Sequence, residues 1–99
     1  MINRKITWDK QALSYFRDYI KYIRQDSPQN AEKVKNEILE KIGELSYRAE
    51  IYNPDKYKLN NDGNYRAFEL HRLRISYFIN NNEIIITRER NTRQAPLDY

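Results

Sequence analysis

The chain has 99 residues, of which 32% are charged and 39% hydrophobic, and its net charge is +4. This composition is typical of a folded protein, and the length suits a single domain over residues 1–99 with one modest core. No segment holds the roughly 18 apolar residues of a membrane span, and the first residues lack a signal-peptide core. We therefore expect a cytoplasmic protein without membrane contact. Because the chain has no cysteine and one histidine, we expect no disulfide, no metal and no cofactor.

A short strand and a helix are predicted at the start of the chain. From Ile2 to Trp8, apolar and polar residues alternate, apart from Arg4, and Asp9 is a suitable helix N-cap. Apolar residues then recur at helical spacing. They are Ala12, Leu13, Phe16, Tyr19, Ile20 and Ile23.

A second helix is predicted to follow directly. Ser27 is a suitable N-cap and Pro28 suits the first helical position, where its missing N–H costs nothing. Residues 47–64, with Pro54 and an Asn-Asp-Gly turn at 61–63, read as irregular. The apolar stripe of this helix is Ala31, Val34, Ile38, Ile42 and Leu45.

Three strands are predicted after the Asn-Asp-Gly turn, where the apolar period changes to two. Residues 65–70 form the first and residues around 73–79 the second, and Asn80–Asn82 make a hairpin turn. The third, residues 83–90, is so apolar at 84–86 that we expect it to be central, with both faces covered. The order strand, helix, helix, strand, strand, strand predicts an α+β fold of two layers. In it, the N-terminal strand and a helical hairpin pack on a mostly antiparallel sheet.

The basic residues are distributed unevenly. Every lysine lies at or before Lys58, and arginines fill the last third of the chain. The positive charge favours an anionic partner, and the planar guanidinium grips phosphate or carboxylate through two hydrogen bonds. The simpler alternative is that these arginines are solvated or pair with Glu69, Glu83 and Glu89. The arginines are Arg66, Arg72, Arg74, Arg88, Arg90 and Arg93.

The element order and two segments resemble the RelE/ParE superfamily, the toxins of type II toxin–antitoxin pairs. The segments are PDKYKLNNDGNYRAFELHRLRISYFI and the strand end TRERNTRQAPLDY. The resemblance implies a RelE-like fold and a cognate antitoxin that is acidic and partly disordered. It implies one of two targets, since some members cleave messenger RNA on the ribosome without metal and others inhibit DNA gyrase. We expect the ribonuclease; the alternatives are a gyrase inhibitor or a non-toxic module that only binds the antitoxin.

Metal-independent RNA cleavage needs a base, an acid and fixed cations around the phosphate. By resemblance, Arg66, Arg74 and Arg90 take the charge-stabilising roles, and we assign substrate binding to three further arginines. Arginine stays protonated, so proton transfer falls to Tyr99 or to His71, the residue whose ordinary pKa is near neutrality. The simpler alternatives are a structural histidine at a strand junction and a frayed tyrosine. The three further arginines are Arg72, Arg88 and Arg93.

Two residues depart from the resemblance. Asn91 stands where similar toxins often have a histidine, and Glu89 stands where they commonly have an aliphatic residue. Asparagine cannot transfer a proton near pH 7. We expect Glu89 either to pair with its neighbouring arginines or to repel phosphate, so both departures weigh against catalysis.

Overall fold

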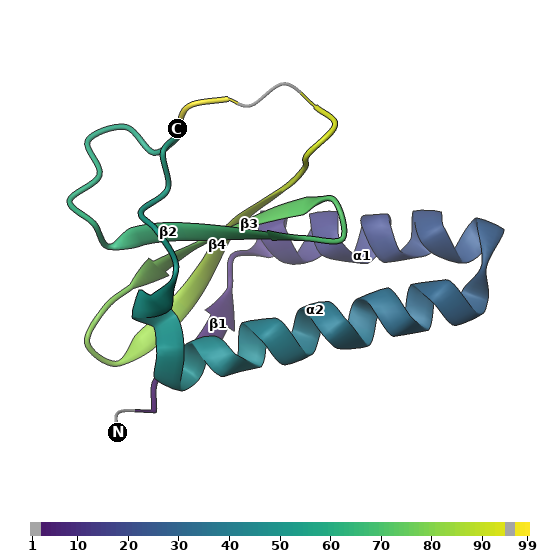
Figure 1. The fold of residues 1–99 in the computed structure, drawn as a ribbon, viewed down its shortest axis with the longest axis horizontal. Helices are drawn as coiled ribbons and strands as arrows, with labels where there is room; N and C mark the ends of the chain where they lie inside the picture. The colour runs from purple at the N-terminus through teal and green to yellow at the C-terminus, as the bar shows by residue number, and fades with distance from the viewer. Residues whose placement is uncertain (1–2, 95–96) are drawn as a thin grey trace.

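The computed structural model describes residues 3–94 and 97–99 and has the predicted α+β fold, with its elements in the predicted order (Figure 1). Ile2, placed in the predicted first strand, lies outside the described residues. One short 3-10 helix, η1, was not predicted. In chain order the elements are β1 (Lys5–Trp8), α1 (Lys10–Asp26), α2 (Pro28–Arg48), η1 (Ala49–Ile51), β2 (Tyr65–Leu70), β3 (Leu73–Ile79) and β4 (Glu83–Asn91).

The four strands form one mixed sheet in the order β1-β4-β3-β2. β1 is parallel to β4, and the other two pairings are antiparallel. β4 is therefore central, as predicted. The two faces of β4 differ, because Ile84 and Ile86 are fully buried against the helices whereas Ile85 on the other face is half-buried.

Side-chain caps fix where the two helices begin. Asp9 accepts a hydrogen bond from the Gln11 N–H at 2.9 Å, and Ser27 Oγ accepts one from the Asn30 N–H at 3.1 Å. Pro28 occupies the first turn of α2. Each cap satisfies a backbone donor that a helix start leaves free, so both predicted starts are confirmed.

The core lies between the helical hairpin and one face of the sheet (Figure 1). Both predicted helical stripes supply it, apart from Leu13, which lies outside the core. β3 contributes Leu73, Ile75, Tyr77 and Ile79. The hydroxyl of buried Tyr77 donates to Ala49 O at 2.6 Å, which ties the sheet to η1. In the described part of the chain, neither helix is long and apolar enough to cross a membrane.

The irregular segment after η1 passes over the opposite face of the sheet, where residues 97–99 join it (Figure 1). Asn61 shapes its turn: the side-chain oxygen accepts from Gly63 N–H at 2.9 Å, and the side-chain amide donates to Tyr65 O at 2.8 Å. Gly63 has a φ of 101°, a conformation that favours glycine. The segment is anchored to the sheet edge by the Asp55 N–H, which donates to Tyr65 O at 2.8 Å.

A β-bulge interrupts β4 at Thr87. Tyr77 pairs with Ile86 and the preceding Ser76 pairs with Arg88, so Thr87 is an extra residue in β4. Its hydroxyl donates to Ser76 O at 3.2 Å. A bulge of one residue resets the alternation of side chains. Arg88 consequently lies on the face away from the helices.

Candidate functional site

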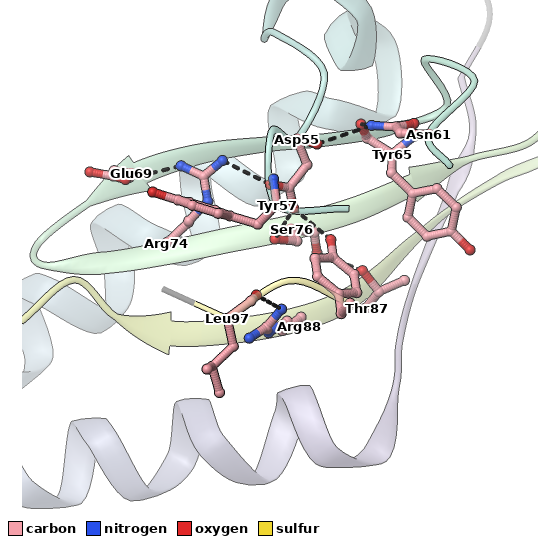
Figure 2. Close-up of polar contacts among 11 residues, drawn as sticks. Asp55, Tyr57, Asn61, Tyr65, Glu69, Arg74, Ser76, Thr87, Arg88 and Leu97 are labelled. Atoms are coloured by element: carbon pink, nitrogen blue, oxygen red, sulfur yellow. Dashed lines mark hydrogen bonds and ion pairs between the residues drawn. The ribbon is translucent and has the colours of Figure 1, made fainter. Parts of the chain in front are cut away.

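A small cavity of about 140 Å³ lies on the sheet face away from the helices. β3 and β4 supply its arginines, and the segment after η1 and residues 97–99 complete its lining (Figure 2). Arg74 and Arg90 are direct cross-strand neighbours, so two of the three predicted catalytic arginines do meet here. The principal lining residues are Asp55, Tyr57, Glu69, Arg74, Ser76, Arg88, Arg90 and Tyr99.

Asp55 is the centre of the hydrogen bonds in this cavity and is only 2% exposed. Its carboxylate accepts from Arg74 Nη2 at 2.9 Å, from Ser76 Oγ at 2.8 Å and from the Tyr99 hydroxyl at 2.5 Å. Burial alone would raise the pKa of Asp55, but the hydrogen bonds from Tyr99 and Arg74 outweigh it and lower the pKa below its usual value. Asp55 therefore stays ionised and binds its neighbours as an anion.

Arg74 is held on two sides. Besides Asp55, it pairs with Glu69 Oε2 at 3.0 Å, and its guanidinium lies 4.8 Å from the centre of the Tyr57 ring (Figure 2). Two carboxylates thus compensate this one cation. Much of the charge of Arg74 is used inside the protein and is less available to a phosphate.

Arg88 and Arg90 also line the cavity. Arg88 Nη1 donates to Leu97 O at 2.8 Å, and its guanidinium lies 4.5 Å from the centre of the Tyr99 ring. Both side chains are half-buried. The Thr87 bulge explains why both arginines share this face, since Arg88 and Arg90 are two residues apart beyond it.

Tyr99 is docked and not frayed. Its N–H donates to Tyr57 O at 2.9 Å and its carbonyl accepts from Leu59 N–H at 2.6 Å. Burial and the hydrogen bond to Asp55 raise the pKa of the Tyr99 phenol to about 12. The proton of this phenol is thus tightly held near neutral pH.

Arg66 does not line the cavity. On β2 it pairs with Tyr77, which packs in the core, so it lies on the helix side of the sheet. Its guanidinium donates to Tyr52 O at 2.6 Å and to Glu50 O at 3.1 Å. These bonds fix the chain after η1, so the structure gives Arg66 a structural position.

His71 and Arg72 form the tight turn between β2 and β3, with φ values of 51° and 64°. His71 Nε2 lies 3.0 Å from Glu37 Oε1, in line with the structural alternative for this residue. Both residues, with Arg93, line a second and separate pocket near the α1–α2 turn. The structure therefore does not bring His71, Arg72 or Arg93 to the cavity that holds Arg74 and Arg90.

Glu89 does not lie between the arginines, contrary to the sequence-based expectation. It pairs with Ile75 on the helix side of β4 and is 2% exposed. Neither carboxylate oxygen has a hydrogen-bond partner among the described residues. Burial raises the pKa of Glu89 to about 8. Asn91 ends β4, where its side-chain oxygen accepts from Arg93 N–H at 2.8 Å.

Sequence reasoning missed Asp55 and Ser76, which complete the cavity. An aspartate in an irregular segment carries no periodic signal, and Ser76 reads as the polar side of a strand. Their roles depend on contacts across 19 to 44 residues of chain. Pro54 directly before Asp55 was the available hint, since a proline restricts the backbone; in the structure it forms an isolated β-bridge with Arg66.

A strand, a helical hairpin and three more strands in one mixed sheet form the fold of RelE/ParE-like toxin domains. The family described as "ParE toxin of type II toxin-antitoxin system, parDE" matches residues 6–96, so the chain belongs to this toxin family. It is the toxin of a type II toxin–antitoxin system.

One similar solved structure supports this fold, and a second is given beside it for its sequence identity alone. A chain of the "Chromosomal ParDE TA system from P. aeruginosa" is similar with a TM-score of 0.71 and 18% identity, over 89% of this chain and 95% of that chain. The YoeB dimer structure from Staphylococcus aureus gives a TM-score of 0.49 and 24% identity, over 86% of this chain and 92% of that chain. No curated protein matches significantly.

Proposed function

We propose that this toxin acts by binding and inhibiting DNA gyrase, without catalysing a reaction. Membership of the ParE family supports this choice over the ribonuclease that the sequence first suggested. The basic cavity face supplies the contacts to the target, with Arg90 as its least engaged arginine. We place this activity in the cytoplasm, where the chromosome and gyrase are found.

The observation that carries the proposal is that, in the described part of the chain, neither candidate for proton transfer, Tyr99 or His71, is placed and free to act beside the arginines. The Tyr99 phenol donates to Asp55 and its pKa is raised to about 12. His71 lines a different pocket and contacts Glu37. General acid–base catalysis requires a group within hydrogen-bond reach whose pKa is near the working pH. A binding mechanism has no such requirement.

We also propose a cognate antitoxin, because a chain of a ParDE toxin–antitoxin system has a similar fold. We expect an acidic protein with a partly disordered segment that orders on the toxin. Its acidic residues complement the net charge of +4. The product of the reading frame adjacent to the toxin gene is the partner to test first.

One observation favours the ribonuclease as a second candidate. The guanidinium groups of Arg74, Arg88 and Arg90 and the hydroxyl of Tyr99 converge on one cavity. Such a cluster suits a phosphate whose charge increases in a transition state. On this reading, substrate binding must displace the hydrogen bond between Tyr99 and Asp55 before the phenol takes part in chemistry.

The deciding experiment measures DNA and RNA damage in the same cells. After induction of the toxin, gyrase-trapped double-strand breaks are expected to accumulate while messages stay intact, and purified gyrase should lose supercoiling activity when the toxin is added. Arg90→Ala should weaken both effects, whereas Arg17→Ala on the exposed side of α1 serves as the matched charge control. Cleaved messages with unbroken DNA would overturn the gyrase proposal in favour of the ribonuclease.

A further inference from the structure

One edge of β4 is paired with a strand over only part of its length. The last pair between β1 and β4 joins Trp8 and Ile86. Beyond Ile86, no strand pairs with this edge in the described part of the chain, and at the far end the Asn91 N–H donates to the Tyr15 hydroxyl at 2.9 Å. An unpaired strand edge is a template for an extended peptide.

A groove with about 420 Å³ of space lies beside this open edge. Gln11 and Tyr15, from the first turns of α1, line one side, and residues 87–90 of β4 also line it. Lys58, from the segment that crosses the sheet, belongs to the lining as well. The groove differs from the 140 Å³ cavity because residues of α1 line it, although Arg88, Arg90 and Tyr99 line both.

Glu89 lines this groove and is the one acidic residue among its described lining residues. It is 2% exposed, and both of its carboxylate oxygens are buried without a hydrogen-bond partner among the described residues. Buried polar groups nearly always have partners, because an unpaired one costs free energy. A side chain that only filled the core at this position would be expected to be apolar.

We propose that the Glu89 carboxyl turns toward the groove when the antitoxin binds and accepts a hydrogen bond from one of its donor side chains, within an extended acidic segment that lies in the groove along β4. This inference rests on the proposed toxin–antitoxin function. Lys58, Arg88 and Arg90 face the acidic residues of the segment, while Glu89 selects a residue such as asparagine, glutamine or lysine at one position. Glu89 thereby determines which antitoxin this toxin accepts.

Replacing Glu89 by an apolar residue should change antitoxin affinity and the stability of the free toxin in opposite directions. In the free toxin the unpaired carboxyl is a cost, so an apolar replacement should raise the melting temperature. In the complex the same replacement leaves the antitoxin donor without a partner and weakens binding. A purely structural role for Glu89 predicts no such opposition.

The test measures the affinity of purified toxin variants for the product of the adjacent reading frame by calorimetry. Glu89→Leu should melt at a higher temperature yet bind at least about tenfold more weakly, the range for loss of a buried polar contact at an interface. Glu89→Gln keeps an acceptor oxygen and should lose no more than about threefold. Glu83→Gln is the matched control, since Glu83 lies on the same strand outside the groove and bonds to Thr7.

The results distinguish failure of the proposed role of Glu89 from failure of the proposed action on gyrase. Binding of Glu89→Leu within about twofold of the parent overturns the role of Glu89, and a loss by Glu89→Gln equal to that of Glu89→Leu overturns its assignment as a hydrogen-bond acceptor. Failure of the parent toxin to bind the adjacent product also overturns it. Gyrase-trapped breaks are scored in cells without that product, so the gyrase proposal stands or falls separately.

Discussion

At the scale of single residues, the arginines of this toxin differ more than their equal charge suggests. Arg74 pairs with a carboxylate that is fully enclosed, whereas Arg66 holds the backbone after η1 and Arg90 contacts no carboxylate among the described residues. A guanidinium that compensates a buried charge is part of the fold. Only an arginine without such a partner is free to serve a target.

Arg74→Ala is therefore expected to destabilise the protein by about 2 kcal/mol or more, because it leaves Asp55 ionised, buried and short of a donor. Arg90→Ala should stay within about 1 kcal/mol of the parent. Urea unfolding followed by circular dichroism measures both. Equal destabilisation by the two variants would show that Asp55 does not depend on Arg74.

Glu89 gives stability a specific pH dependence. Burial raises its pKa to about 8 in the folded protein, from an ordinary value of 4.5 for a glutamate. Between these values the folded state holds a proton that the unfolded state releases, so stability is full below about pH 4.5 and falls as the pH rises to about 8. The loss at Glu89 should reach a few kcal/mol in order of magnitude.

Glu89→Gln removes this titration, so its stability advantage over the parent should grow steadily from pH 5 to pH 8. Urea unfolding at unit intervals of pH measures the advantage. Glu83→Gln is the matched control on the same strand, because Glu83 has a hydrogen-bond partner in Thr7 and is half-buried. A constant difference between Glu89→Gln and the parent across this range would contradict the burial of an unpaired carboxyl.

At the scale of elements, the bulge in β4 places Arg88 and Arg90 on the cavity face. In a regular strand of the same sequence, Glu89 would lie on that face instead. Thr87 is the extra residue, and the pairs on either side of it, Tyr77 with Ile86 and Ser76 with Arg88, would be consecutive without it. Removing Thr87 should therefore leave a regular strand with every later side chain on its present face.

Deletion of Thr87 is expected to fold, with a loss of about 1 kcal/mol from the missing hydroxyl contact and altered twist. Insertion of one alanine between Arg88 and Glu89 is the matched control, since it moves Arg90 toward the core and Glu89 out of it. We expect the insertion to destabilise far more than the deletion in thermal unfolding. The reverse ranking would show that the bulge itself is required for folding.

The sequence predicted those elements whose determinants are local. The caps at Asp9 and Ser27, the apolar stripes and the asparagine turns each depend on residues a few positions apart, and all are confirmed except Leu13 in the first stripe, which lies outside the core. The bulge could not be predicted from the sequence, because threonine is an ordinary residue in a strand and Thr87 breaks no visible pattern. The side on which Glu89 lies follows from that bulge, so the sequence alone placed it wrongly among the arginines.

At the scale of the whole molecule, both faces of the sheet are covered. The helical hairpin buries one face with apolar side chains, and the segment after η1 with residues 97–99 covers the other through polar contacts (Figure 1). The second cover is held largely by Asp55, which binds Arg74 from the sheet and Tyr99 from the end of the described chain. The network that shapes the candidate site therefore also stabilises the fold.

Tyr99→Phe separates these two roles and tests the mechanism in cells. It removes only the hydroxyl that donates to Asp55, so we expect a loss of about 1 kcal/mol in unfolding free energy. If the toxin acts by binding gyrase, growth arrest and trapped breaks should persist. If the phenol transfers a proton, the rate of RNA cleavage should fall by about 10² to 10⁴ and cells should grow.

Tyr57→Phe is the matched control in the same cavity, since its link to Asp55 is through the backbone N–H. Growth restored by Tyr99→Phe at unchanged expression and stability, but not by Tyr57→Phe, would favour the ribonuclease over the binding mechanism.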